Sequence, residues 1–139
     1  MKLDKLDIKT TEVLDWNGVN LFHFQGSACS QKLRIFLNYK NIDWISHEIN
    51  LIKGEQFSKW YLGINPRGLV PTLVHNGDVH IESNDIMTYL DQEFPNTKLF
   101  PPNLIDEIQK DLEFEDSLHF DLRRLTFRYL VPHILGKKD

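Results

Sequence analysis

The stretch Ile64–Leu73, which reads Ile-Asn-Pro-Arg-Gly-Leu-Val-Pro-Thr-Leu, constrains the fold more than any other part of the chain. Pro66 follows an asparagine and precedes a glycine by two residues, a pattern that predicts a turn. Pro71 has no N–H, so it belongs at the start of the β-type run Thr72–Val74 rather than inside it. A cis bond before a proline costs only about 0.5–1 kcal/mol. Such a bond would leave the main-chain groups of Val70 to pair with a peptide-like ligand; the plain alternative is a loop that enters a strand.

The composition indicates one globular domain in a reducing compartment. The chain has 139 residues, of which 41% are hydrophobic and 12% aromatic, enough for a packed core. A net charge of −4 argues against a sequence-independent nucleic-acid surface, which needs clustered Lys and Arg. The single cysteine, Cys29, excludes an internal disulfide. The chain shows neither a signal peptide nor a run of roughly 20 apolar residues, so we expect a cytoplasmic protein that binds neither nucleic acid nor membrane.

Hydrophobic periodicity predicts an α/β domain over residues 19–94, preceded by a polar N-terminal extension, residues 1–18. Trp16-Asn17-Gly18-Val19 reads locally as a hairpin turn. The predicted elements are a strand Val19–Phe24, a helix Ala28–Lys40, a strand Trp44–Leu51, a short helix Gly54–Leu62, a hairpin of Thr72–Val74 and Val79–Ile81 across Asn76-Gly77, and a helix that Ser83 caps and Pro95 ends.

The remainder of the chain predicts a linker, residues 95–103, and one long helix from Leu104 to Val131. The linker contains three prolines, and Pro132 ends the helix. Leucines recur along the helix at spacings of three and four, while a set of phenylalanines lies off that stripe. Because one isolated helix cannot bury two apolar faces, we expect a neighbour that covers it, either another subunit or a further domain.

Ser27 lies between the first predicted strand and the helix that follows it. A hydroxyl and the helix N–H groups at this point favour negative charge, and a thiolate is such a charge. A thiol near pKa 8.5 is mostly protonated at neutral pH, and hydrogen bonding to the charged form lowers its pKa. We therefore predict that Ser27 donates a hydrogen bond to the sulfur of a ligand. The alternative is a serine that only caps the helix.

Glu82 and Ser83 form a second candidate site at the start of the next helix. Ser83 can offer its N–H and its hydroxyl to a carboxylate at the helix N-terminus, and it can also act simply as a cap. Lys53 is a further candidate for a carboxylate, although a lone surface lysine is usually solvated.

Together these motifs resemble the glutathione transferases over residues 19–102. Asn-Pro-x-Gly-x-Val-Pro-x-Leu matches the family segment in which a cis-proline holds the backbone of the tripeptide. Gly26-Ser27-Ala28-Cys29-Ser30 is similar to the Ser-Ser-Cys-Ser loop of the serine-type enzymes, most closely the zeta class, and the likeness continues through Ile49–Lys53 and Gln56–Lys59. The family's second serine is Ala28 here, and residues 1–18 have no counterpart that we recognise.

The resemblance implies roles and a fold. The fold is a thioredoxin-like βαβαββα domain, followed by the linker and by one long helix of a truncated all-α domain, residues 104–139. Ser27 would be catalytic, Val70 would pair with the cysteinyl backbone, and Glu82 with Ser83 would hold the γ-glutamyl end; Lys53 would meet the glycyl carboxylate. The family places the strand Val19–Phe24 between two neighbours, which argues against the hairpin at Trp16–Val19.

Cysteine and histidine chemistry is not expected. Cys29 has no partner cysteine, which excludes a dithiol mechanism and disfavours a thiol-disulfide oxidoreductase, and we expect a buried, inert thiol. The six histidines show no metal-ligand spacing, and no metal site is predicted.

The leading hypothesis is a glutathione-dependent transferase that uses glutathione as co-substrate and forms a homodimer. The activated thiolate would attack a small electrophile, either in a conjugation or in a zeta-like isomerisation that returns the tripeptide. The alternative is a non-enzymatic glutathione-binding or protein-interaction module without a complete electrophile site. Glutathione affinity without conjugation activity would separate the second hypothesis from the first.

Overall fold

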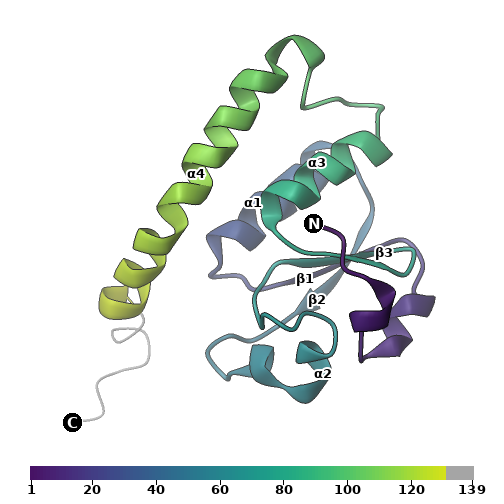
Figure 1. Cartoon of the computed structure of the whole chain (residues 1–139), viewed down its shortest axis with the longest axis vertical. Helices are drawn as coiled ribbons and strands as arrows, with labels where there is room; N and C mark the ends of the chain where they lie inside the picture. The colour runs from purple at the N-terminus through teal and green to yellow at the C-terminus, as the bar shows by residue number, and fades with distance from the viewer. Residues whose placement is uncertain (131–139) are drawn as a thin grey trace. The chain divides into compact units, whose positions relative to one another are not determined.

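The computed structural model describes residues 1–130 and divides into two compact units, of which the first is Met1–Leu99. The elements of the first unit follow the order β-α-β-α-β-β-α, which confirms the predicted order (Figure 1). They are β1 (Val19–His23), α1 (Ala28–Tyr39), β2 (Trp44–Glu48), α2 (Lys59–Leu62), β3 (Thr72–His75), β4 (Asp78–His80) and α3 (Ser83–Glu93).

The four strands form one mixed sheet in the order β2-β1-β3-β4. β1 runs parallel to β2 and antiparallel to β3, and β3 runs antiparallel to β4. Every residue of β1 is buried, as expected for a strand with neighbours on both edges. This central position rules out the hairpin at Trp16–Val19, because β1 pairs with β2 and β3 instead of with the segment before it.

Helices cover both faces of the sheet (Figure 1): α1 and α3 lie on one face, and α2 lies on the other. The predicted apolar face of α1 is confirmed, since Leu33, Phe36 and Leu37 are buried. On the α2 side, Phe22 packs edge-to-face against the ring of Tyr61, with ring centroids 5.7 Å apart. Both side chains are fully buried, so this aromatic pair anchors α2 to β1.

Several predicted boundaries were wrong by a few residues. The second strand ends at Glu48 instead of Leu51, because residues 51–54 form a turn held by the Asn50 side chain, which accepts from the N–H groups of Ile52 and Lys53. The predicted helix Gly54–Leu62 is a short 3-10 helix, Glu55–Phe57, followed by α2. Ser58 separates the two, with an extended backbone and a hydroxyl that caps α2.

Residues 1–18 are more structured than their polar composition suggests. Lys2 bridges to His80, and the N–H of Leu3 donates to the carbonyl of Val79 at 2.8 Å, which extends the sheet beyond β4. Two short 3-10 helices follow, and from them Ile8 and Val13 enter the core that also contains Phe22 and Tyr61. The segment therefore covers an otherwise open sheet edge.

The second unit contains the long helix α4 (Ile105–Leu125), which continues as a π-helical turn, Thr126–Leu130. The prediction of one long helix is confirmed for the described residues, while the predicted end at Val131–Pro132 lies outside them. No residue of α4 is buried. Its exposed large apolar side chains include members of both predicted sets: Leu118, Leu122 and Leu125 of the leucine stripe, and Phe114 and Phe120 of the phenylalanine set.

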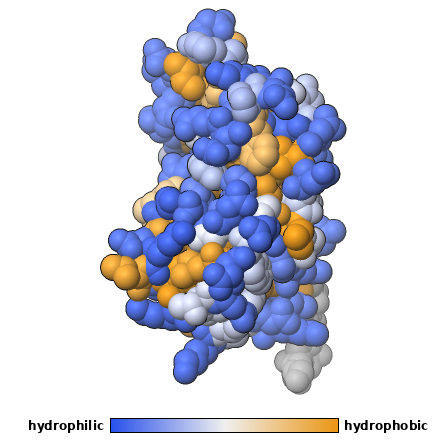
Figure 2. Space-filling view, turned by 90° about the vertical axis from the view of Figure 1, so that its right-hand side faces the viewer, coloured by the Kyte–Doolittle hydropathy of each residue, from blue (hydrophilic) through white to orange (hydrophobic). Residues whose placement is uncertain are grey.

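The surface carries hydrophobic residues in separate patches among a mainly hydrophilic face (Figure 2). None of the helices within residues 1–130 has the length and hydropathy needed to cross a bilayer.

Candidate functional site

Strand register brings the predicted site residues of three segments to one end of the sheet. Phe22 near the end of β1 pairs with Thr72, the first residue of β3, so the loop after β1 and the turn before β3 lie at the same end of the sheet. Leu73 pairs with His80, the last residue of β4, and α3 begins three residues later at Ser83. The loop with Ser27, the turn with Val70 and the start of α3 therefore meet at this end of the sheet.

Ser27 is the N-cap of α1, and its hydroxyl accepts a hydrogen bond from the N–H of Ser30 at 3.2 Å. Capping uses the oxygen as an acceptor, and the hydroxyl hydrogen stays available for donation. The residue is half-buried. The capping role that the sequence suggested is confirmed, and it is compatible with donation to a ligand sulfur.

The loop that carries Ser27 is fixed by side chains that sequence reasoning did not single out. The Ser30 hydroxyl accepts from the N–H of Phe24 at 3.3 Å, and Arg34 donates to the carbonyls of Phe24 and Gln25 at 3.2 and 3.3 Å. The sequence does offer a signal for this role: Ser30 and Arg34 are four residues apart and therefore lie on the same face of α1, one helical turn from each other.

Val70 follows Leu69, whose carbonyl accepts a hydrogen bond from the Tyr61 hydroxyl. The bond from Val70 to Pro71 is cis. Among residues 1–130, no hydrogen bond uses the main-chain N–H or C=O of Val70. β3 begins at Thr72, which confirms that Pro71 precedes the strand.

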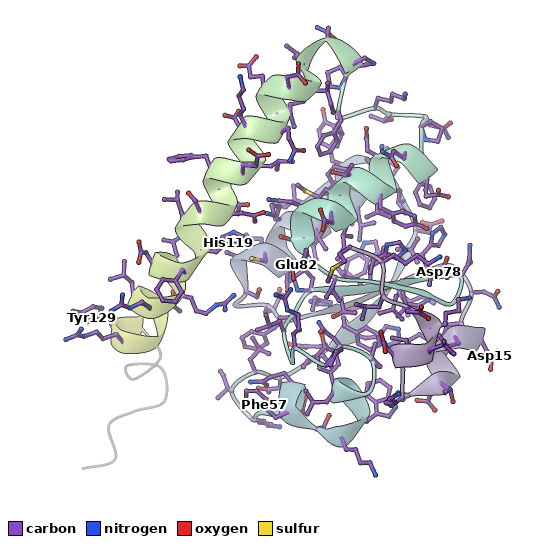
Figure 3. The ribbon with its side chains drawn as sticks, viewed as in Figure 1. Asp15, Phe57, Asp78, Glu82, His119 and Tyr129 are labelled. Atoms are coloured by element: carbon purple, nitrogen blue, oxygen red, sulfur yellow. The ribbon has the colours of Figure 1, made fainter. Side chains whose placement is uncertain are left out.

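Glu82, and not Ser83, occupies the cap position of α3, so the predicted cap was wrong by one residue. Its backbone has a positive φ of 67°, which is uncommon outside glycine and often marks ligand sites. Its carboxylate pairs with the guanidinium of Arg67, and both side chains are about half exposed. Figure 3 shows Glu82 at the start of α3, at the opposite end of β4 from Asp78.

Ser83 is the first residue of α3 and is 7% exposed. Within the described part of the chain, its hydroxyl makes no hydrogen bond. The first N–H groups of a helix have no intrahelical partner, and no side chain caps those of α3. This helix end therefore offers hydrogen-bond donors and the positive end of the helix dipole to an anion.

α1 and α3 are joined beside this helix end. The Lys32 ammonium donates to the Asn84 side chain at 2.6 Å, which links the second turn of α1 to the first turn of α3. Lys53, in contrast, is an exposed residue of the turn after β2. The segments that carry Ser27, Val70, Glu82 and Ser83 thus lie at one end of the sheet, while Lys53 lies on the turn after β2.

The predicted burial of Cys29 was wrong, since its side chain is only partly buried at the start of α1. On α4, Glu115, Asp116 and His119 place one possible ligand atom each within 4.8 Å of one another. This i, i+1, i+4 spacing contains one histidine and two carboxylates, so spacings between histidines alone do not indicate it. The imidazole nitrogens of His119 are 2.5 and 3.4 Å from the two carboxylates, so direct contacts between the side chains also explain the group.

Comparison with known proteins gives a consistent result. A family model described as "Glutathione S-transferase, N-terminal domain" matches residues 21–98. A zeta-class glutathione S-transferase of Euphorbia esula is 40% identical over 86 residues, which cover 62% of this chain and 38% of the relative. A maleylacetoacetate isomerase of Aspergillus fumigatus is 37% identical over 91 residues, or 60% of this chain and 39% of the relative.

Solved structures agree with the fold. A glutathione transferase homologue of Drosophila mojavensis with bound glutathione aligns with a TM-score of 0.75 and 25% identity, covering 80% of this chain and 53% of that chain. The sheet order and helix placement are those of the thioredoxin-like fold of these proteins. The chain spans about two fifths of the length of the curated relatives it matches.

Proposed function

The chain belongs to the glutathione S-transferase family through its N-terminal domain, and on that premise we propose that it binds glutathione at the sheet end formed by Ser27, Val70 and Ser83 and activates the thiol for attack on a small electrophile. The observation that carries the proposal is the convergence of three kinds of donor at one place: a hydroxyl, an unused main-chain N–H and an uncapped helix N-terminus. These groups suit the sulfur, the backbone and a carboxylate of a tripeptide.

Ser27 acts on the sulfur. Its hydroxyl oxygen accepts from the N–H of Ser30, so its hydrogen points to a different acceptor. A hydrogen bond from this hydroxyl, together with the positive end of the α1 dipole, favours the thiolate over the thiol and lowers the thiol pKa. The thiolate is the nucleophilic form.

Glu82 and Ser83 hold the γ-glutamyl end. The Ser83 hydroxyl and the N–H groups of the first turn of α3 bind the carboxylate, and the Glu82 carboxylate binds the ammonium. In the structure Glu82 is paired with Arg67, so the ligand ammonium takes a place beside, or instead of, this guanidinium. Val70 pairs with the cysteinyl backbone as an added strand would. Lys53, which lies on the turn after β2, binds the glycyl carboxylate in this proposal.

The reaction is a conjugation or a glutathione-dependent isomerisation in which the tripeptide is returned. The second form is supported by the relatives named maleylacetoacetate isomerase. We propose a cytoplasmic homodimer whose interface includes the exposed apolar side chains of α4.

The alternative is a non-enzymatic glutathione-binding or protein-interaction module. One observation favours it: α4 carries exposed large apolar side chains, and exposed apolar patches mark interaction surfaces.

The experiment has two stages. Retention on immobilised glutathione and titration calorimetry first establish binding, and a conjugation assay and a cis–trans isomerisation assay with a small unsaturated diacid then test turnover. Binding with turnover supports the enzyme, binding without turnover supports the alternative, and no binding contradicts both.

A matched pair of variants tests the role of Ser27. Ser27 and Ser58 both cap helices, and both hydroxyls accept from an N–H at 3.2 Å. Ser27→Ala and Ser58→Ala should therefore each cost about 1 kcal/mol of stability. Only Ser27→Ala should raise the pKa of the bound thiol, followed by the ultraviolet absorbance of the thiolate. Equal thiol pKa values in the two variants would show that Ser27 is only a cap.

A further inference from the structure

We propose that Tyr61, Asn65 and Thr72 are positioning residues for ligand binding, because they hold the peptide unit between Leu69 and Val70 and so aim the Val70 N–H away from the core. This inference rests on the proposed glutathione site, and it adds three buried side chains that touch no ligand themselves.

The three side chains converge on a single acceptor, the carbonyl oxygen of Leu69. The Tyr61 hydroxyl donates to it at 2.6 Å and the Asn65 amide nitrogen at 3.0 Å, while the Thr72 hydroxyl lies 3.4 Å away. The side chains also bond to one another, since the Thr72 hydroxyl is 2.9 Å from both the Tyr61 hydroxyl and the Asn65 nitrogen. Their residues are at most 1% exposed, so water does not compete for the carbonyl.

The hydrogens in this cluster can be assigned from the partners. The Asn65 side-chain oxygen accepts from the N–H of Arg67 at 3.0 Å, so the amide nitrogen faces the Leu69 carbonyl. The single hydrogen of the Tyr61 hydroxyl goes to Leu69, and the Thr72 hydroxyl can therefore donate to the Tyr61 oxygen. Burial raises the pKa of Tyr61 far above its usual value, so this donor keeps its hydrogen at physiological pH. The Tyr61 hydroxyl and the Asn65 amide thus donate to the Leu69 carbonyl directly, and Thr72 supports it through the Tyr61 oxygen.

The geometry of the peptide bond turns this anchoring into a direction. The bond between Leu69 and Val70 is trans, because Val70–Pro71 is the one cis bond among the described residues. In a planar trans peptide the C=O and the following N–H point in opposite directions. When the Leu69 carbonyl is held towards the buried cluster, the Val70 N–H must point away from it. Because the direction of the Val70 N–H is already fixed in the free protein, ligand binding does not pay the entropic cost of ordering this peptide unit.

The neighbouring turn does not supply this constraint alone. The N–H of Gly68 bonds to the Asn65 carbonyl at 3.0 Å and closes the turn before Leu69. Closing that turn leaves the rotation of the next peptide plane open, and the bonds to the Leu69 carbonyl fix it. The cluster of Tyr61, Asn65 and Thr72 therefore fixes the direction of the Val70 N–H, which the ligand uses. This effect can be measured separately from folding.

The test uses a tyrosine pair within the same chain. Tyr61→Phe removes the hydroxyl that donates to Leu69 and keeps the ring against Phe22. Tyr89→Phe is the control, because the Tyr89 hydroxyl makes a comparable bond at 2.7 Å to His75, outside the proposed site. Asn65→Ala is a second variant at the cluster, so the test does not depend on one substitution.

Two measurements distinguish a change in the direction of the Val70 N–H from a general loss of structure. The residual dipolar coupling of the Val70 N–H reports the direction of that bond in the ligand-free protein, with the Val74 N–H in β3 as internal reference. Titration calorimetry with glutathione gives the affinity, which should fall about two- to tenfold in Tyr61→Phe, as for a lost hydrogen bond.

We expect the Val70 coupling to change in Tyr61→Phe and Asn65→Ala and to stay unchanged in Tyr89→Phe, with Val74 unchanged in all three. An unchanged Val70 coupling in both cluster variants overturns the inference, whether or not glutathione binds. If the wild-type protein does not bind glutathione, the proposed function fails, and the coupling still decides the role of the cluster.

Discussion

Acidification should destabilise the protein through His80, a residue of β4 that is 4% exposed. Its Nε2 atom is buried and has no hydrogen-bond partner within the described residues, and its ring stacks on Tyr89 at 3.9 Å between centroids. Burial is the largest cause that lowers the pKa of His80, to about 4 from a usual value of 6.5. Smaller influences come from the charged groups facing it: the Met1 ammonium, Lys2 and His75 lower the pKa, and Asp78 raises it.

The sign and size of the effect follow from linkage. In the unfolded chain His80 takes up a proton near pH 6.5, whereas in the folded chain it does so only near pH 4. Between these values the unfolded state binds more protons, so stability is fully present above pH 6.5 and is lost as the pH falls towards 4. At about 1.4 kcal/mol per pKa unit, the loss reaches roughly 3 kcal/mol, of which about 2 falls between pH 7 and 4.5.

Urea denaturation at a series of pH values, on the wild type and on His80→Phe, measures this contribution. Phenylalanine keeps a ring against Tyr89 and cannot titrate, so the stability of the variant should fall less steeply between pH 7 and 4.5. His23 and His47 also have pKa values lowered by burial, and their contribution remains in both proteins and cancels in the difference. Parallel stability profiles for the two proteins across this range would show that His80 does not contribute to the loss of stability.

Three further predictions concern binding, packing and assembly. Glu82→Ala and Ser83→Ala should each weaken glutathione binding by roughly 1.5–3 kcal/mol in titration calorimetry, with a smaller effect on folding; unchanged affinity in both would contradict the proposed site. Lys40→Met should cost about 3–5 kcal/mol in urea denaturation, because the buried ammonium bonds to the Asp91 carboxylate at 2.6 Å, and Lys40→Met with Asp91→Leu should recover part of the loss. Leu118→Glu on α4 should shift the mass measured by light scattering towards the monomer, whereas an unchanged mass would exclude this face as the contact.

The order of elements in the first unit could be predicted from local patterns. The apolar period of α1, the Asn76-Gly77 turn of the hairpin and the proline before β3 each describe a few neighbouring residues. Such signals depend on backbone preferences and on one buried face, both of which the sequence states directly. The candidate residues Ser27 and Ser83 were found in the same way, because helix starts carry recognisable chemistry.

Contacts between distant segments could not be predicted in this way. Ile8 and Val13 lie in a polar segment without a clear period, and only the folded chain shows that both enter the core. The positive φ of Glu82, which moves the cap of α3 by one residue, is likewise set by the path from β4 into the helix.

Residues that are close together in the chain indicate which elements form and which side chains can do chemistry. Where those side chains meet, and in which direction they point, depends on contacts between distant segments. The strand register brings the turn before β3 and the start of α3 to one end of the sheet, and the buried bonds of Tyr61 and Asn65 hold the Leu69 carbonyl next to Val70. Register and peptide orientation are fixed by hydrogen bonds between segments, and a linear sequence contains the donors and acceptors without showing which of them pair.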